Sequence, residues 1–108
     1  MNRIEKKTAI SAGDAIKAFL RQYRLTPALN TRRISEAWDD ASGAAAYTVR
    51  RYFRDGRLYI TLNSSVVRSQ LSFQKEALLD RINAILKDDI LFDCEDRDTG
   101  FVKELILK

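Results

Sequence analysis

The sequence predicts a small α+β domain with the element order ααββαβ, in which a three-stranded sheet packs on helices. Three observations indicate this class. Apolar residues recur at helical spacing before residue 43, an Asp-Gly pair then joins two strand-like segments, and an apolar run closes the chain. The length of 108 residues suits one domain, with no internal repeat or interdomain linker. We expect a flexible basic arm over residues 1–10 and a single domain over residues 11–108.

The first helix is expected over residues 12–24. Ile16, Phe19, Leu20 and Tyr23 recur at the spacing of one helical face, while lysine and arginine occupy the other side. This pattern is typical of an amphipathic helix.

Thr26 and Pro27 predict the start of a second helix, because threonine is a frequent N-cap and proline is favoured at the first helical position. Gly43 is expected to end this helix, since glycine adopts the left-handed conformation of a C-cap without strain. Trp38 falls in the apolar stripe of the helix and is interpreted as a core residue.

A β-hairpin is the clearest local signal in the chain. Asp55 and Gly56 separate strand-like residues 47–54 from residues 57–62, and an Asp-Gly pair suits a two-residue hairpin loop. With this loop, one face of the hairpin is mostly apolar and should pack on the helices. The expected pairs are Arg54 with Arg57, Tyr52 with Tyr59, Arg50 with Thr61, Phe53 with Leu58, Arg51 with Ile60 and Val49 with Leu62.

A long third helix and a last strand are expected after the hairpin. Asn63, Ser64 and Ser65 supply an N-cap for a helix over residues 66–87. Its apolar stripe consists of Val67, Leu71, Leu78, Ile82 and Ile85. An acidic connector from residue 88 to residue 100 should lead to a strand over residues 101–107.

The charge of the chain is unevenly distributed. The net charge of +4 combines 19 basic with 15 acidic side chains. Residues 1–36 carry eight basic and three acidic side chains, and residues 37–75 carry six and three, whereas residues 76–108 carry five and nine. A basic body of this kind suggests a polyanionic partner, although ordinary solubilising surface charge would give a similar count.

The second face of the predicted hairpin is the main candidate site. Guanidinium groups can hold phosphates while tyrosine rings stack on bases, so this mixture is typical of a nucleic-acid surface. A solvated sheet face with a favourable tyrosine pair is the alternative interpretation. Arg54 and Arg57 would repel each other across the strands, which favours an external anion. The candidate residues on this face are Arg50, Tyr52, Arg54, Arg57 and Tyr59, with Thr48 and Thr61 beside them.

Two further groups of basic residues are candidates for nucleic-acid binding. Lys17, Arg21 and Arg24 on the first helix could extend the basic surface, or could form an ordinary solvated face. Arg68 lies near the serines that start the third helix, where free backbone N–H groups could receive a phosphate. Simple capping by the serines is the alternative there.

Composition argues against an enzyme and against a metal site. The chain has no His and a single Cys, Cys94, so neither a histidine-dependent triad nor a Cys/His zinc cluster can form. Cys94 is expected to be a small, partly buried residue. Asp93, Glu95, Asp96 and Asp98 do not match the spacing of a calcium-binding loop and should form a solvated loop. We therefore expect no cofactor. Without an apolar run long enough for a membrane span, we also expect a cytoplasmic protein.

Several short segments, in order and at fixed spacing, resemble the DciA family of bacterial proteins. They are Ala37-Trp38-Asp-Asp-Ala-Ser-Gly43, Ala46-Tyr-Thr, Asp55-Gly56-Arg-Leu58-Tyr-Ile60, Ser64-Ser65, Gln70-Leu71 and Leu78-Leu-Asp-Arg-Ile82-Asn83. The resemblance covers roughly residues 12–107 and is to a short, single-domain member. It implies a K-homology-like fold and a role with the DnaB-type replicative helicase. The Gly-x-x-Gly loop by which K-homology domains clamp a nucleic-acid backbone does not occur in this sequence.

The leading hypothesis is therefore a non-enzymatic DNA-replication module that contacts a DnaB-type helicase and single-stranded DNA. Two alternatives remain open. The first is an RNA-binding module built on the same basic and aromatic surface. The second is a pure protein-interaction domain, which could form a homodimer through an exposed strand edge.

Overall fold

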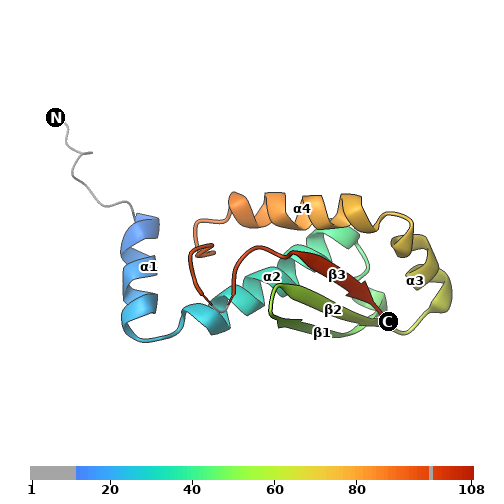
Figure 1. Cartoon of the computed structure of the whole chain (residues 1–108), viewed down its shortest axis with the longest axis horizontal. Helices are drawn as coiled ribbons and strands as arrows, with labels where there is room; N and C mark the ends of the chain where they lie inside the picture. The colour runs from blue at the N-terminus through green and yellow to red at the C-terminus, as the bar shows by residue number, and fades with distance from the viewer. Residues whose placement is uncertain (1–11, 98) are drawn as a thin grey trace.

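The computed structural model describes residues 12–97 and 99–108 and confirms an α+β fold (Figure 1). The arm expected over residues 1–10 lies outside the described residues. The elements, in chain order, are α1 (Ala12–Gln22), α2 (Thr26–Ser42), the short 3-10 helix η2 (Ala45–Tyr47), β1 (Thr48–Arg54), β2 (Arg57–Leu62), α3 (Ser65–Ser72), α4 (Lys75–Lys87) and β3 (Glu104–Leu107). The described part measures 56 × 27 × 22 Å, and α1 and α3 lie at opposite ends of it.

The sheet has the strand order β1-β2-β3, with β1 antiparallel to β2 and β3 parallel to β2. Asp55 and Gly56 form the hairpin loop, and both have a positive φ, of 53° and 81°, as a tight primed turn requires. The predicted register is confirmed from the Arg54–Arg57 pair through to the pair of Arg50 with Thr61.

The register prediction is wrong at the start of β1, where Leu62 pairs with Thr48 instead of Val49. A bulge at Val49 adds one residue to this strand and so reverses the face on which the preceding residue lies. Thr48 therefore turns toward the helices, where its Oγ1 accepts a hydrogen bond from Trp38 Nε1 at 3.0 Å and donates to Ala44 O at 2.8 Å. The expectation that Thr48 accompanies the basic hairpin face is wrong.

The second helix starts one residue earlier than its sequence suggests. Leu25 occupies the N-cap position, and Thr26 is already helical and buried, so its prediction as the N-cap is wrong. The reason is the tight turn from α1: Arg24 has a φ of 59°, and the Leu25 N–H donates to Leu20 O at 2.8 Å. The C-terminal prediction is confirmed, because Gly43 adopts a φ of 64°.

The prediction of one long helix over residues 66–87 is wrong. The helix is interrupted at Phe73 and Gln74, which separate α3 from α4. The N-cap prediction for α3 is confirmed, since the Ser64 Oγ accepts from the Val67 N–H at 3.2 Å. The residues between the buried Leu71 and the buried Leu78 are all exposed, and Phe73 among them is 89% exposed. This segment therefore makes no apolar contact with the core. The break lets α3 lie at the end of the sheet while α4 runs along it, and the element order becomes ααββααβ.

The hydrophobic core lies between the sheet and the pair α2 and α4, which pack on each other and on one sheet face. Trp38 is fully buried, as predicted. The last strand is shorter than expected and begins at Glu104. Core residues include Ile34, Trp38, Phe53, Leu58, Ile60, Leu78, Ile82, Leu86, Phe92, Val102 and Leu105.

Two asparagine side chains hold the connector (residues 88–103) between α4 and β3. Asn30 of α2, which is 0% exposed, donates to Asp93 O at 2.8 Å and to Thr99 O at 3.1 Å, and its Oδ1 accepts from the Asp93 N–H at 2.9 Å. Asn83 of α4 likewise donates to Val102 O at 2.8 Å and accepts from the Val102 N–H at 2.9 Å. The connector's backbone groups thus find side-chain partners in place of a strand or helix.

The prediction of a solvated acidic loop is therefore wrong at Asp93, which is buried. Cys94, expected to be partly buried, is exposed. No group of three or more His, Cys, Asp or Glu side chains among the described residues could hold a metal ion. Among the described helices, none combines the length and the hydropathy that crossing a membrane would require.

We predict that Asn30→Ala lowers the free energy of unfolding by about 2–3 kcal/mol, because it leaves the buried Asp93 N–H and two carbonyls without partners. Urea unfolding followed by the fluorescence of the buried Trp38 measures the change. Arg32→Ala on the exposed side of the same helix is the control and should cost less than about 0.5 kcal/mol. Equal losses in the two variants would contradict the role given to Asn30.

Candidate nucleic-acid interface

The sheet face that the helices leave open, here called the outer sheet face, carries three rows of side chains across the strands. The register fixes these rows, because aligned residues on neighbouring strands point to the same side. The rows are Arg54, Arg57 and Glu104 near the hairpin loop; Tyr52, Tyr59 and Ile106 in the middle; and Arg50 and Thr61 at the far end, with Lys108 beside them.

A shallow depression of about 340 Å³ lies over the second and third rows. The rings of Tyr52 and Tyr59 form its floor, with centroids 5.8 Å apart and an interplanar angle of 39°. The guanidinium carbon of Arg50 lies 5.3 Å from the Tyr52 ring centre, and the Lys108 ammonium lies 5.1 Å from that of Tyr59. Each tyrosine therefore carries a cation at its ring, which is the combination that binds bases and phosphates together.

The arginines next to the hairpin loop have internal carboxylate partners. Arg54 lies 3.6 Å from Asp55, and the Arg57 Nε donates to a Glu104 carboxylate oxygen at 3.1 Å. A hydrogen bond to the Tyr59 oxygen, together with Glu104, raises the pKa of Arg57 above its ordinary value. The repulsion between Arg54 and Arg57 is thus compensated within the chain, and it does not by itself require an external anion.

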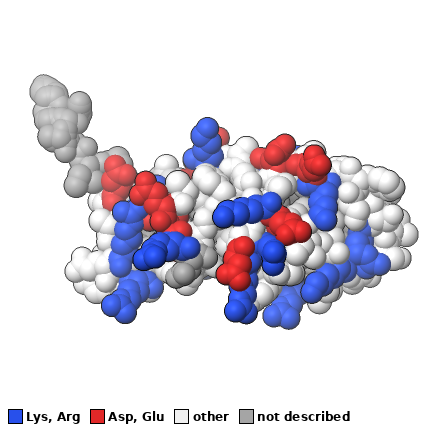
Figure 2. All heavy atoms as spheres, viewed as in Figure 1, with Lys and Arg blue, Asp and Glu red and all other residues white. Residues whose placement is uncertain are grey.

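Arg50 and Lys108 differ from these two arginines. Both side chains are exposed, and neither forms an ion pair with any residue that the structure describes. Figure 2 shows Lys and Arg side chains along the edge of the molecule on which β1 lies, with most of the visible Asp and Glu on the opposite edge and beside α1. The positive potential of the outer sheet face is therefore expected to be strongest around Arg50 and Lys108.

The basic residues of the first helix do not join the outer sheet face. Arg21 on α1 bonds to Asp93 at 2.6 Å and lies 3.6 Å from Glu95, at the end of the molecule away from α3. Lys17 and Arg24 belong to the same end of the chain. Nucleic-acid binding by these three residues stays a prediction that the geometry of the sheet does not support.

Arg68 lies on α3, away from the rows of the sheet, and its side chain is half-buried. The Ser64 hydroxyl already satisfies the Val67 N–H, so capping describes this helix start and phosphate binding there stays a prediction.

Sequence reasoning missed Glu104, Ile106 and Lys108. The apolar run predicted the last strand, but it did not predict which strand this one pairs with or in which direction. A parallel β3 beside β2 places these three residues on the same face as the tyrosines. The Lys108 N–H and carbonyl are held by Ile60 O and the Leu62 N–H, which continues the ladder past the strand.

Fold and site together define a small α+β module whose sheet has one face buried by helices and one open face of cations and aromatic rings. The chain belongs to the DciA family, because the family model described as Dna[CI] antecedent, DciA matches residues 11–92. The DciA family is described as one of helicase loaders in DNA replication, which are generally non-enzymatic.

One curated relative is a protein described as a Diels-Alderase from Gibberella fujikuroi, with 32% identity over 80 residues. The match covers 72% of this chain and 21% of that protein, so the chain spans about a fifth of its relative. No solved structure matches the chain.

We predict that the anchor between α1 and the connector weakens in acid. The hydrogen bond from Arg21, supported by the Glu95 N–H, lowers the pKa of Asp93 despite its burial. A carboxyl whose folded pKa is depressed stabilises the fold above its unfolded pKa of about 3.9, and this contribution disappears as the pH falls through the folded pKa.

The measurement compares the unfolding free energies of the native chain and Asp93→Asn from pH 7 to pH 3. The advantage of the native chain should be constant above about pH 4 and shrink below it. An advantage that grows as the pH falls would contradict the ion pair.

Proposed function

We propose that the chain is a non-enzymatic accessory module of DNA replication that contacts a DnaB-type helicase and binds single-stranded DNA on its outer sheet face. Family membership supports the helicase partner. The observation that carries the DNA assignment is the pair Tyr52 and Tyr59 with Arg50 and Lys108 at their rings. A surface of this composition holds single strands without requiring a particular sequence.

In this proposal, Tyr52 and Tyr59 stack on successive exposed bases, while Arg50 and Lys108 neutralise the flanking phosphates. Tyrosine rings on a β-sheet suit this task, because stacking needs an accessible ring face and a rigid support. The hairpin register fixes the backbones of both tyrosines, Tyr52 is 41% exposed, and both side chains line the depression.

The proposed architecture is K-homology-like. An antiparallel pair followed by a parallel strand, with helices on one face, supports this assignment. The chain has no Gly-x-x-Gly loop, so the backbone clamp typical of such domains would fall to the cations of the sheet.

We predict that replacing Arg50 and Lys108 together by Ala flattens the salt dependence of single-stranded DNA binding. Each phosphate contact contributes about 0.7 to the slope of log affinity against log salt, so the slope should fall by about 1.4. Fluorescence anisotropy of a labelled oligothymidine across a salt series measures it. Arg81→Ala, which removes an exposed cation from α4, is the matched control and should leave the slope nearly unchanged.

Two further variants in the same titration separate charge from stacking. Tyr52→Ala should weaken binding by about 1–3 kcal/mol without changing the slope. Glu104→Gln removes the carboxylate beside Arg57 and should strengthen binding at low salt. Unchanged slopes in the double variant, or a Tyr52→Ala variant that binds normally, would refute this placement of the site.

The helicase partner is tested separately from the DNA site. The immobilised chain should capture a purified DnaB-type helicase from the same organism after nuclease treatment, and the Arg50 and Lys108 double variant should capture it equally well. Capture that disappears with nuclease would mean that nucleic acid bridges the two proteins. Competition between RNA and DNA oligomers of one sequence tests the alternative of an RNA-binding module, because contacts to the 2′-OH favour RNA.

A further inference from the structure

Helix α1 turns its apolar side away from the protein. No residue of α1 is buried, although its sequence is strongly amphipathic. Ile16 is 40% exposed, Phe19 is 55% exposed and Tyr23, just beyond the helix, is 58% exposed. Together with Ala12 and Ala15 these residues form one uncharged stripe, here called the α1 stripe, because they recur at helical spacing.

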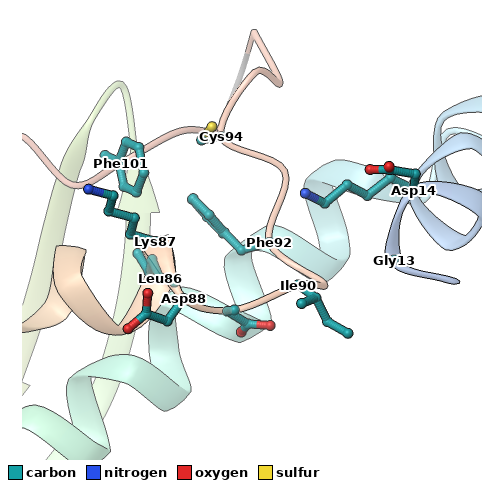
Figure 3. A pocket seen from close by; sticks show the side chains of 11 residues that line it. Gly13, Asp14, Leu86, Lys87, Asp88, Ile90, Phe92, Cys94 and Phe101 are labelled. Atoms are coloured by element: carbon teal, nitrogen blue, oxygen red, sulfur yellow. The ribbon is translucent and has the colours of Figure 1, made fainter. Parts of the chain in front are cut away.

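The side of α1 that holds it to the protein carries the half-buried Lys17 and Leu20 together with Arg21. Arg21 bonds to the buried Asp93 at 2.6 Å, and the charge of Lys17 helps to lower the pKa of the same carboxyl. A hollow of about 410 Å³ separates this side from the connector. In Figure 3, Asp14 extends from α1 toward the hollow, and Phe92 lies across it.

This orientation is the reverse of that of an ordinary surface helix. An amphipathic helix normally buries its apolar face and shows its charges to water, since uncovered apolar surface is unfavourable. Here Arg21 faces the connector while the rings of Phe19 and Tyr23, whose centroids lie 4.7 Å apart, face solvent. A contiguous aromatic patch of this kind indicates an interaction surface.

We propose that the α1 stripe binds the same stripe of a second copy of this chain, in an antiparallel helix pair. The stripe is self-complementary in size. Its first part offers the small Ala12 and Ala15, and its last part offers the large Phe19 and Tyr23. An antiparallel arrangement inserts the rings of each copy over the alanines of the other, and it also opposes the two helix dipoles.

The position of α1 makes this contact possible. It lies at one end of a molecule 56 Å long, away from α3 (Figure 1). Two copies can therefore meet end to end without covering the outer sheet face. A single helix pair buries less than the roughly 1,200 Å² typical of stable complexes, so the dimer is weak and depends on concentration. The proposed dimer thus forms through α1, and it differs from the alternative of a homodimer through an exposed strand edge.

Sedimentation equilibrium of the full chain, from micromolar to millimolar concentrations, tests the proposal. The native chain should change from monomer to dimer, and Phe19→Glu should raise the dissociation constant at least about thirtyfold, as expected for an aromatic anchor. Phe73→Glu is the matched control, because Phe73 is even more exposed but lies at the opposite end. The unchanged fluorescence of Trp38 will show that each variant is folded. A native chain that stays monomeric, or a dimer that Phe19→Glu leaves intact, overturns the proposal.

Cysteine cross-linking tests the orientation. In a Cys94→Ser background, which removes the exposed native thiol, Ala12→Cys and Tyr23→Cys are prepared as separate variants. Antiparallel helices place Ala12 of one copy beside Tyr23 of the other, whereas like positions are about 16 Å apart along the axis. A short thiol cross-linker should therefore join the mixture of the two variants and neither variant alone.

Cross-linking of Ala12→Cys to itself would overturn the antiparallel pair. A monomeric native chain whose Ala12→Cys thiol becomes protected only when purified DnaB-type helicase is added would assign the α1 stripe to the helicase instead. That result would overturn the dimer and leave the DNA-binding titrations unaffected.

Discussion

The buried amide of Asn30 is the contact on which the arrangement of the chain depends most. A parallel β3 can reach β2 only through a long crossover, and the last part of that crossover has no helix or strand of its own. Asn30 satisfies the backbone of Asp93 and Thr99, and Asn83 does the same for Val102. Because the connector is fixed in this way, β3 pairs with β2 in one register. Asp93 is then in place to bind Arg21 of α1.

The composition of the outer sheet face follows from the direction of β3. Parallel pairing places Glu104 beside Arg57 near the hairpin loop and brings Lys108 to Tyr59 at the other end. Near the hairpin loop, the arginines of this face therefore have carboxylate partners. At the other end, Arg50 and Lys108 lie at the aromatic rings without such a partner among the described residues. An antiparallel β3 would have reversed this order and put the carboxylate near the tyrosines of the depression. The charge pattern of the site is thus a consequence of topology as much as of the hairpin sequence.

The hairpin, the helix end at Gly43 and the core position of Trp38 could be predicted because each depends on a local pattern. Such signals need only a few neighbouring residues, such as a turn that requires a positive φ. The bulge that turns Thr48 to Trp38 and the break at Phe73 depend instead on what the segment meets in three dimensions. The same holds for Asp93, whose burial is decided by Asn30, a residue 63 positions earlier in the chain. Lys108 could not be assigned to the site without the pairing of β3.

The net charge of +4 takes on a different meaning once these contacts are known. The basic residues of the first helix and the acidic residues of the connector belong to one internal contact, represented by Arg21 with Asp93. They do not add to a common basic surface, and they free the apolar side of α1 to face outward. On the outer sheet face, by contrast, Arg54 and Arg57 have carboxylate partners, while Arg50 and Lys108 have none among the described residues. A polyanion would therefore bind the outer sheet face, whereas a partner with an apolar surface would bind the α1 stripe. The two surfaces lie in different parts of the molecule, so neither partner needs to displace the other.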